Sequence, residues 1–332
     1  MEKGDITRNM KYFKDKKIFI TGAGSIGSEI LDRILNYDIH SVRIFDNCEL
    51  KLHNLRQKYK DSDKSIKYLL GDIRDRDRLA TAMRDVDIGF STAALKHVSF
   101  CEDNPIDAIK TNILGTQNII DVAINENVEK IINISSDKAT NPINVMGATK
   151  LLSERMIASA LHYKGRCRTI FATVRFGNVF DSSGSVVPIF RELIQDGKTL
   201  TITDPAMTRF MMTIDNAVKL VFEATKLSHG EDIFILKMPS IKIIDLANAM
   251  IQKYDKDVGM EIIGIQDGEK LHEALITEEE SKSAYENDEI IVIPSKENID
   301  YYVKRGFKKL SVGAITSDEN HILSIDEIKE LL

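Results

Sequence analysis

Cysteine, long apolar runs and an excess of positive charge are scarce in this sequence, and each absence excludes a class of protein. The three cysteines, Cys48, Cys101 and Cys167, are odd in number and far apart, so they suit a reducing compartment and match no metal-ligand spacing. No apolar run approaches the roughly 18 residues that span a bilayer. The formal net charge of -6 argues against a general nucleic-acid binder, which is usually basic.

The first residues, 1–5, lack the apolar stretch of a secretory signal peptide. Together with the cysteine content, this predicts a cytoplasmic protein with neither a membrane nor a nucleic acid as partner. His272 and Glu273 lack the second histidine of a zinc-binding helix, so we expect no metal. The 332 residues, 43% of them hydrophobic, are enough for one large or two modest domains.

Short apolar segments alternate with helical patterns along the first half of the chain. This alternation predicts parallel crossovers and an α/β fold with a Rossmann-type doubly wound sheet. After about residue 180 the pattern is less regular, so we expect residues 1–180 to bind the cofactor and residues 181–332 to add a smaller substrate-binding lobe. The predicted strands are residues 17–21, 42–45, 66–70, 86–90, 130–134, 169–174 and 290–293, and the predicted helices include residues 26–35, 105–127, 185–197 and 214–227.

A glycine-rich turn follows the first predicted strand and opens the first predicted helix. Gly22 suits a tight turn, Gly24 lets the backbone approach a pyrophosphate, and Gly27 lets the helix pack on the strand. With Ser25 and Ile26, these residues begin a helix whose free N–H groups face the phosphates. The pattern therefore predicts a dinucleotide site, although incidental glycines in an ordinary turn are the alternative.

The acidic residue at the end of the second strand bears on the choice of cofactor. Asp46 lies 19 residues after Gly27, where a carboxylate binds a ribose 2′-hydroxyl and repels a 2′-phosphate. This favours NAD over NADP, with a loop residue or helix cap as the alternative. Asp72 and Ile73, after the third strand, are placed near the adenine, and a solvated loop is the alternative for Asp72.

The segment after the fifth strand carries the candidate catalytic residues. Ser136 lies near the strand end, and Met146 and Lys150 are four residues apart on one helix face. This placement resembles the extended short-chain dehydrogenase/reductases, in which a Ser or Thr works with a Tyr-x-x-x-Lys pair. Met146 occupies the tyrosine position and cannot take a proton, so a non-catalytic NAD-binding protein is one interpretation.

The chain resembles, more closely, the UDP-N-acetylglucosamine 4,6-dehydratases of bacterial glycan biosynthesis. Some members of that family have methionine at the tyrosine position. The resemblance runs from about residue 12 to 280, and its motifs are residues 93–98, 110–116, 135–150, 175–179, 184–188, 203–210 and 268–273.

The resemblance implies removal of water across C5 and C6 of UDP-N-acetylglucosamine. A hydride leaves C4 for NAD and later returns to C6, so the cofactor is regenerated. Lys138 is the expected base at C5 and Asp137 the expected acid at the C6 hydroxyl. Lysine acts as a base only when it is neutral; an ion pair with Asp137 opposes that state, whereas burial favours it. The acceptor of the C4 proton is left open between Ser136 and Lys150, and Lys150 is also expected to bind the nicotinamide ribose.

Further residues of the shared motifs are expected around the two ligands. Ala93 is expected beside the cofactor. The substrate-binding candidates are Lys96, His97, Asn178, Ser185, Val186, Arg209 and Glu269, with Arg209 suited to phosphate by its planar donor fork. A structural histidine is the alternative for His97.

Two departures from the family pattern concern ligand contacts. Many members carry Ser-Arg-Asp at residues 46–48, which suits NADP, whereas Asp46 here suits NAD. Members also often carry Arg-Pro-Gly-Glu-Lys at residues 266–270, and the missing arginine puts one phosphate contact in doubt.

Three readings of the function remain open from the sequence. They are a 4,6-dehydratase, a nucleotide-sugar 4-epimerase and a catalytically silent NAD-binding regulator. For the dehydratase, Met146 and Asp46 resemble the methionine-type family members that have an acidic residue at the NAD position, and this resemblance implies retention of configuration at C5 over inversion. The fold commonly pairs through a two-helix face, so we expect a homo-oligomer, a dimer or higher.

Overall fold

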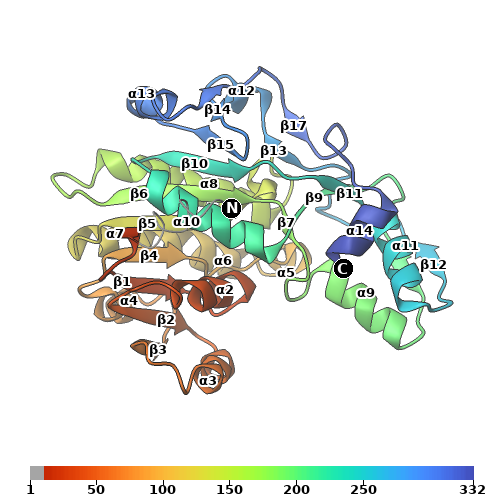
Figure 1. The fold of residues 1–332 in the computed structure, drawn as a ribbon, viewed down its shortest axis with the longest axis horizontal. Helices are drawn as coiled ribbons and strands as arrows, with labels where there is room; N and C mark the ends of the chain where they lie inside the picture. Colours follow the sequence, from red (N-terminus) through yellow and green to blue (C-terminus); the bar gives the residue numbers. More distant parts are fainter. Residues whose placement is uncertain (1–10) are drawn as a thin grey trace.

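A computed structural model describes residues 11–332, so the first ten residues of the predicted cofactor domain lie outside the described part. A ten-stranded sheet forms its centre, with strand order β16-β14-β15-β10-β6-β5-β4-β1-β2-β3 (Figure 1). The strands from β3 to β10 pair in parallel, and the three beyond β10 pair antiparallel. The run 3-2-1-4-5-6 is the Rossmann order, which confirms the predicted fold class. The strands are β1 (Lys17–Thr21), β2 (Ser41–Asp46), β3 (Ile66–Leu70), β4 (Ile88–Ser91), β5 (Lys130–Ser136), β6 (Ile170–Phe176), β10 (Asp232–Leu236), β14 (Tyr285–Glu286), β15 (Ile290–Ile293) and β16 (Lys308–Lys309).

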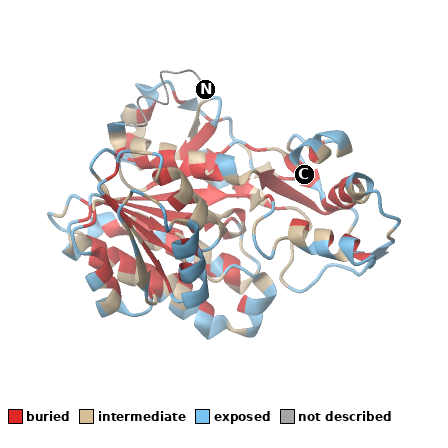
Figure 2. Ribbon diagram, turned by 60° about the horizontal axis from the view of Figure 1, so that its bottom comes forward, coloured by how far each residue is buried: buried red, intermediate tan, exposed pale blue. Residues whose placement is uncertain are grey.

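Helices cover both faces of this sheet and bury its apolar strands (Figure 2). One hydrophobic core lies under α2 (Ser25–Ile34), α3 (Glu49–Lys58) and α10 (Ile214–Leu227). A second lies on the opposite face under α4 (Arg76–Met83), α7 (Gly115–Asn125) and α8 (Val145–Ser159). Burial of the sheet on both sides explains why its central strands read as continuous apolar runs.

The predicted elements form, with shifted ends in several of them and a break in one helix. The fifth strand continues to Ser136, because Ser135 and Ser136 still pair with β6. The predicted helix over residues 105–127 is divided into α6 (Pro105–Ala108), a π-helical stretch η1 (Ile109–Leu114) and α7. A π-helical turn rotates the residues that follow it, which a 3.6-residue periodicity does not reveal.

Much of the chain after residue 180 forms a smaller lobe with its own hydrophobic core, on the right in Figure 1. Strands β10, β14, β15 and β16 nevertheless join the large sheet, so the predicted boundary near residue 180 stays a prediction. The smaller lobe and its connections contain β7 (Asn178–Val179), α9 (Val186–Gln195), β8 (Leu200–Ile202), β9 (Thr208–Met212), β11 (Ser240–Lys242), α11 (Ile243–Tyr254), β12 (Met260–Ile262), β13 (Ala274–Ile276), β17 (Ile315–Thr316) and α14 (Ile325–Leu331). The other short helices are α5 (Val98–Asp103), η2 (Asp137–Ala139), η3 (Ala160–His162), α12 (Glu278–Ser281), η4 (Lys296–Asn298) and α13 (Ile299–Val303).

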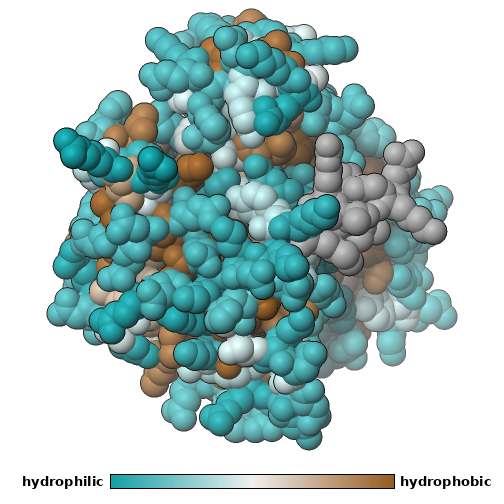
Figure 3. Space-filling model, turned by 60° about the vertical axis from the view of Figure 1, so that its left-hand side comes forward, coloured by the Kyte–Doolittle hydropathy of each residue, from teal (hydrophilic) through white to brown (hydrophobic). Residues whose placement is uncertain are grey.

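The face drawn in Figure 3 is mostly hydrophilic. On the face in Figure 3, hydrophobic residues lie in small groups between hydrophilic ones. Within residues 11–332, every helix is too short or too polar to cross a bilayer.

Candidate functional site

The glycine loop between β1 and α2 has the geometry of a dinucleotide-binding turn. Gly22 has φ +87°, and a Cβ on Gly27 would lie 1.8 Å from the carbonyl oxygen of Gly22. A Cβ on Gly24, by contrast, would meet no atom of the described residues within 4 Å. Each glycine therefore has a separate role: a left-handed turn, an open approach and a close packing contact.

The start of α2 is available to a phosphate group. Its N-cap is Gly24, which has no side chain to satisfy the first backbone N–H groups, while Ser25 and Ile26 form the first turn. An uncapped helix N-terminus beside an open glycine is a favourable site for an anion. The loop therefore fits a pyrophosphate.

Asp46 holds the loop through both of its carboxylate oxygens. Oδ2 accepts a hydrogen bond from the backbone N of Ala23 at 2.6 Å, and Oδ1 accepts one from the backbone N of Cys48 at 2.7 Å. The side chain is buried at the carboxyl end of β2. Its position is the one predicted for a ribose contact, and its bonds show a second role in shaping the loop.

The three other predicted cofactor residues lie around the same strand ends. Asp72 accepts a hydrogen bond from Asn47, which is next to Asp46, and forms an ion pair with Arg74 at 2.7 Å. Ile73 is buried, and a Cβ on Gly115 would lie 2.6 Å from its Cδ1, so Ile73 packs under α7. The backbone of Ala93 borders Gly22, with its N atom 2.9 Å from a Cβ built there.

A segment of the smaller lobe lies against the glycine loop. The backbone N of Ser183 donates to Ser25 Oγ at 3.0 Å, and Lys96 Nζ donates to the carbonyl of Ser183 at 2.5 Å. His97 is exposed, and a Cβ on Gly184 would lie 2.7 Å from its ring. Partial desolvation by the surrounding segments lowers the pKa of both Lys96 and His97. These two residues therefore contact the segment next to the cavity described below.

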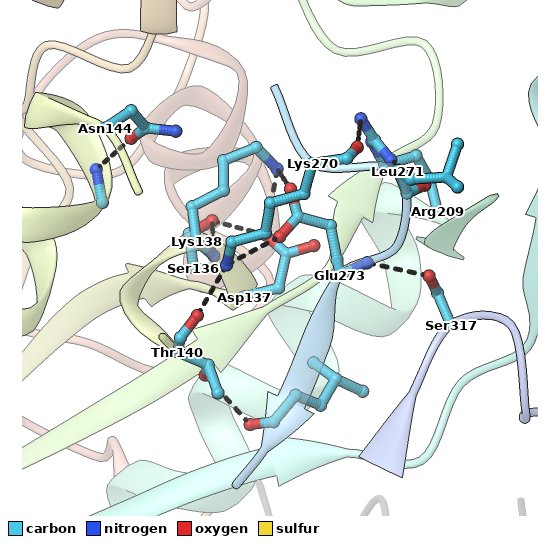
Figure 4. A network of polar contacts seen from close by, with 12 residues as sticks. Ser136, Asp137, Lys138, Thr140, Asn144, Arg209, Lys270, Leu271, Glu273 and Ser317 are labelled. Carbon is cyan, nitrogen blue, oxygen red and sulfur yellow. Dashed lines mark hydrogen bonds and ion pairs between the residues drawn. The ribbon is translucent and has the colours of Figure 1, made fainter. Parts of the chain in front are cut away.

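The turn after β5 places three polar side chains in one hydrogen-bonded group (Figure 4). Ser136 Oγ donates to Asp137 Oδ1 at 2.7 Å, and Lys138 Nζ donates to the same oxygen at 3.0 Å. Lys138 also donates to Asn178 Oδ1 at 3.1 Å. Asp137 is fully buried, and its Oδ2 accepts no hydrogen bond from the described residues. Oδ1 of Asp137 thus accepts two hydrogen bonds from side chains, whereas Oδ2 can accept one from a further donor.

The charge balance around Lys138 favours the ammonium form. Burial lowers the pKa of Lys138, but the carboxylates of Asp137 and Glu273 outweigh burial and raise that pKa above its ordinary value. Of the two opposing effects that the sequence suggested, the ion pair therefore wins. A role for Lys138 as a base requires another group to take its proton.

The start of α8 brings the tyrosine-equivalent position and the lysine to the same place. Asn144 caps the helix by accepting from the backbone N of Gly147 at 2.7 Å. Met146 is 3% exposed and packs in an apolar cluster with Cys101 and Ala108. Lys150 Nζ donates to the carbonyl of Ile134 in β5 at 2.9 Å, and burial lowers its pKa to about 8. Met146 thus belongs to an apolar cluster, and Lys150 loses its proton at lower pH than an exposed lysine does.

A cavity of about 280 Å³ opens beside this group, between the sheet and the smaller lobe. It collects Lys138 and five of the predicted substrate-binding residues: Asn178, Ser185, Val186, Arg209 and Glu269. Lys96 and His97 are not among its lining residues, but their neighbour Val98 is. The cavity therefore joins segments that are far apart in the sequence.

The polar residues that line the cavity differ in how far their hydrogen-bonding groups are already used within the protein. Ser185 Oγ is buried and has no hydrogen-bond partner among the described residues. Arg209 instead donates to the backbone carbonyls of Thr208, Lys270 and Leu271, at 2.7, 2.9 and 3.1 Å. Arg209 thus links β9 to the loop before β13. These hydrogen bonds use some of the guanidinium N–H groups that we expected from the sequence to bind phosphate.

Sequence reasoning missed several residues that border the cavity. Glu273 is the chemically important one, because its buried carboxylate lies 3.7 Å from Lys138 Nζ. A signal was present, since Glu273 belongs to the motif at 268–273. The other missed lining residues are Val98, Asn144, Phe190, Thr201, Thr203, Met207, Ile243 and Gly268.

Glycine 147 is a further residue that positions the site. A Cβ there would lie 2.3 Å from the carbonyl oxygen of Lys138, so the helix α8 approaches the turn η2 as closely as a glycine permits.

Within residues 11–332, no group of three or more His, Cys, Asp and Glu side chains is arranged to hold a metal ion.

The sheet order, the glycine loop and the cavity at the strand ends define a Rossmann-type nucleotide-binding protein. The family model described as polysaccharide biosynthesis protein matches residues 18–295. The chain belongs to this family.

Relatives match over most of their length. An uncharacterized membrane protein of Methanocaldococcus jannaschii is 49% identical over 290 residues, 85% of this chain and 86% of the relative. A UDP-N-acetylglucosamine 4,6-dehydratase (inverting) of Campylobacter jejuni is 43% identical over 292 residues, 87% and 86% of the two chains. A UDP-glucose 4-epimerase of Rickettsia conorii is 38% identical over 329 residues, 96% of each. The resemblance seen in the sequence is thereby confirmed.

Among solved structures, the crystal structure of Pen from Bacillus thuringiensis has a TM-score of 0.91 with this chain. The two are 42% identical, and the match covers 96% of this chain and 97% of that one.

Proposed function

We propose that this protein is a hydro-lyase, a UDP-N-acetylglucosamine 4,6-dehydratase that uses NAD and yields a UDP-4-keto-6-deoxy-N-acetylhexosamine for bacterial glycan biosynthesis. The carrying observation is the ion pair between the buried Asp137, which accepts a hydrogen bond from Ser136, and the partly buried Lys138, which lines the cavity. A pair of proton-transferring groups is what loss of water across two carbons requires. The Campylobacter relative, which bears this activity in its name, supports the assignment.

The residues of the glycine loop fit NAD. Gly24 leaves room for a pyrophosphate at the uncapped start of α2, and Asp46 is placed to accept a hydrogen bond from a ribose hydroxyl and to repel a 2′-phosphate. NAD held there would supply a reversible hydride acceptor for the change at C4 and C6. We assign the adenosine side to Asp72 and Ile73 and the nicotinamide side to Ala93 and Lys150.

The side chains after β5 then divide the proton transfers. The hydrogen bond from Ser136 to Asp137 offers a route by which the C4 hydroxyl proton reaches the Asp137 carboxylate. Asp137, once protonated, serves as the acid for the departing C6 hydroxyl, and Lys138 serves as the base at C5. Lys150 supplies positive charge beside the C4 oxygen, and Met146 shields the reacting atoms from water.

The cavity accounts for the remaining substrate-binding residues. We assign the nucleotide diphosphate to the side lined by Ser185, Val186 and Arg209, and the sugar to the side lined by Lys138 and Asn178. Glu269, on the loop before β13, closes the cavity wall, while Lys96 and His97 act through the segment at 183–184.

The outcome at C5 stays a prediction. Return of the proton by Lys138, the group assigned to remove it, would deliver it to the same sugar face and give retention. The name of the Campylobacter relative points instead to inversion. Proton NMR of freshly formed product distinguishes the two outcomes.

A nucleotide-sugar 4-epimerase is the second candidate, because the Rickettsia relative carries an epimerase name. Epimerisation has no leaving hydroxyl, so it gives Asp137 and Lys138 no proton to transfer at C6 and C5. The buried pair therefore favours the dehydratase.

The deciding experiment is incubation of the purified protein with UDP-N-acetylglucosamine, followed by mass spectrometry. Loss of one water supports the dehydratase, an isomeric product supports the epimerase, and unchanged substrate supports a silent regulator.

We also infer that the protein is cytoplasmic and forms a homo-oligomer. Cell fractionation would test the location, and light scattering would test the oligomeric state.

A further inference from the structure

Glu273 is a buried carboxylate to which the reaction outlined above gives no role. It directly precedes β13, and only 4% of its surface is exposed. Its backbone N donates to Ser317 Oγ at 3.0 Å, and the backbone N of Ser317 donates to its carbonyl at 2.8 Å. This two-sided tie fixes where the carboxylate stands in the cavity wall.

The carboxylate of Glu273 stands between two lysines (Figure 4). Oε1 lies 3.7 Å from Lys138 Nζ, and Oε2 lies 3.4 Å from Lys270 Nζ. Lys270 is anchored elsewhere, since it donates to the carbonyl of Thr140 at 2.7 Å. Oε2 accepts no hydrogen bond from the described residues. Glu273 thus keeps the capacity to accept a proton.

Lys138 has to lose a proton before it can act as a base. The charged groups around it are Asp137 from its own turn, Glu273 and Lys270 from the loop before β13, and Arg209 from β9. Asp137 is already assigned as the acid for the C6 hydroxyl. Lys270 and Arg209 are cations and cannot accept a further proton. Glu273 is the remaining acceptor in this group.

We propose that Glu273 is a positioning residue that takes the ammonium proton of Lys138, so that the neutral amine can remove the C5 proton. This inference rests on the proposed dehydratase function. The proton moves from Lys138 Nζ to a Glu273 oxygen, which leaves an amine and a carboxylic acid. The amine then takes the C5 proton and becomes an ammonium again. When that proton returns to carbon, Glu273 gives its own proton back to Lys138.

Closure of the cavity by the substrate supplies the reason for the transfer. Expelling water removes the solvation that sustains two separate charges, and a pair 3.7 Å apart has no direct hydrogen bond to compensate. The neutral amine and carboxylic acid are therefore stabilised relative to the ammonium and carboxylate. Protonation of Asp137 in the same cycle removes the second counter-ion of Lys138 and acts in the same direction.

The test compares Glu273→Gln and Glu273→Asp with the wild-type protein and with Glu279→Gln, a charge-loss control at an exposed position of α12. Two rates are measured in D₂O buffers across pH: reduction of the bound cofactor in a single turnover, and entry of deuterium at C5. For Glu273→Gln we expect cofactor reduction to stay within about twofold. We expect deuterium entry at neutral pH to fall about 10²-fold, the low end for a proton-transfer group.

The pH profile separates this role from a structural one. Glu273 raises the pKa of Lys138, so its loss lowers that pKa and lets solvent base deprotonate the lysine as pH rises. The deficit of Glu273→Gln should therefore shrink at high pH, and Glu273→Asp should recover part of the rate. An equal deficit at every pH, normal deuterium entry at neutral pH, or loss of cofactor reduction would overturn the inference. If the wild-type protein forms no dehydrated product, the proposed function fails first, which is a distinguishable result.

Discussion

The glycine loop after β1 and the charged group after β5 lie at the same edge of the sheet, but they are held by different forces. The loop is defined by space: a methyl group on Gly27 would collide with a backbone oxygen, whereas one on Gly24 would project into an open region. The group around Lys138 is defined by charge, with a buried carboxylate, an ammonium and a second carboxylate in contact. Changes in the loop should therefore affect folding and cofactor binding, and changes in the charged group should affect chemistry.

The largest expected effect is that of Gly27→Ala. Its Cβ would lie 1.8 Å from the Gly22 oxygen, so β1 and α2 must separate, which we expect to destabilise the fold by at least about 2 kcal/mol and to abolish NAD retention. Gly24→Ala is the matched control. It should keep the unfolding temperature and weaken NAD binding alone. Thermal unfolding and cofactor content measure both effects, and equal stability of the two variants would contradict the steric argument.

Next in size is the contrast between Lys150→Met and Met146→Leu. Removing the cation that we assign to the C4 oxygen should slow cofactor reduction by about 10³-fold, whereas a volume-conserving change at the buried Met146 should retain most activity. Single-turnover absorbance measures both. A Met146→Leu variant as inactive as Lys150→Met, with NAD bound, would mean that the sulfur has a specific role.

Asp137→Asn and Lys138→Met test the charged group directly. Each should reduce dehydration at least about 10²-fold while NAD stays bound, because we assign proton transfer to these side chains and they lie outside the cofactor loop. Product formation and cofactor content are measured on the same samples. Near-normal turnover in either variant would remove that residue from its assigned step.

The pH dependence of the first step should be more modest. Burial lowers the pKa of Lys150 to about 8, so the cation is present below that pH and is lost as pH rises through it. We therefore expect the rate of cofactor reduction to decline severalfold above pH 8. A rate that keeps rising there would indicate that neutral Lys150 acts as the base at C4.

The smallest expected effect is on cofactor choice. Asp46→Ala removes the carboxylate that disfavours a 2′-phosphate and also two hydrogen bonds to the loop backbone. Discrimination of NAD against NADP should fall by about tenfold, which titration of the two cofactors would measure. If the wild-type protein is purified with NADP, this assignment of Asp46 is wrong.

Wherever neighbours in the chain decide the structure, the sequence predicted it well. The order of strands and helices, the roles of Gly22 and Gly27 and the pairing of Met146 with Lys150 follow from short-range spacing. The break at η1 was missed, because a π-helical turn leaves no sign in an apolar periodicity.

The charge state at the site depended on contacts that cross the chain. From sequence, burial and ion pairing of Lys138 opposed one another, and the balance required the positions of Asp137 and of Glu273, which is 135 residues away. Likewise, Arg209 was assigned to phosphate by residue type, but its backbone carbonyl partners come from the loop before β13 as well as its own strand.

The sequence by itself determined the Rossmann sheet, the dinucleotide loop and the segment that carries Ser136, Asp137, Lys138 and Lys150, because periodicity and glycine spacing are local constraints. Only the tertiary structure decided that Glu273 lies between Lys138 and Lys270 and that a cavity forms between the sheet and the smaller lobe. The physical reason is that electrostatic energy depends on distance and burial, which the packing of remote segments sets.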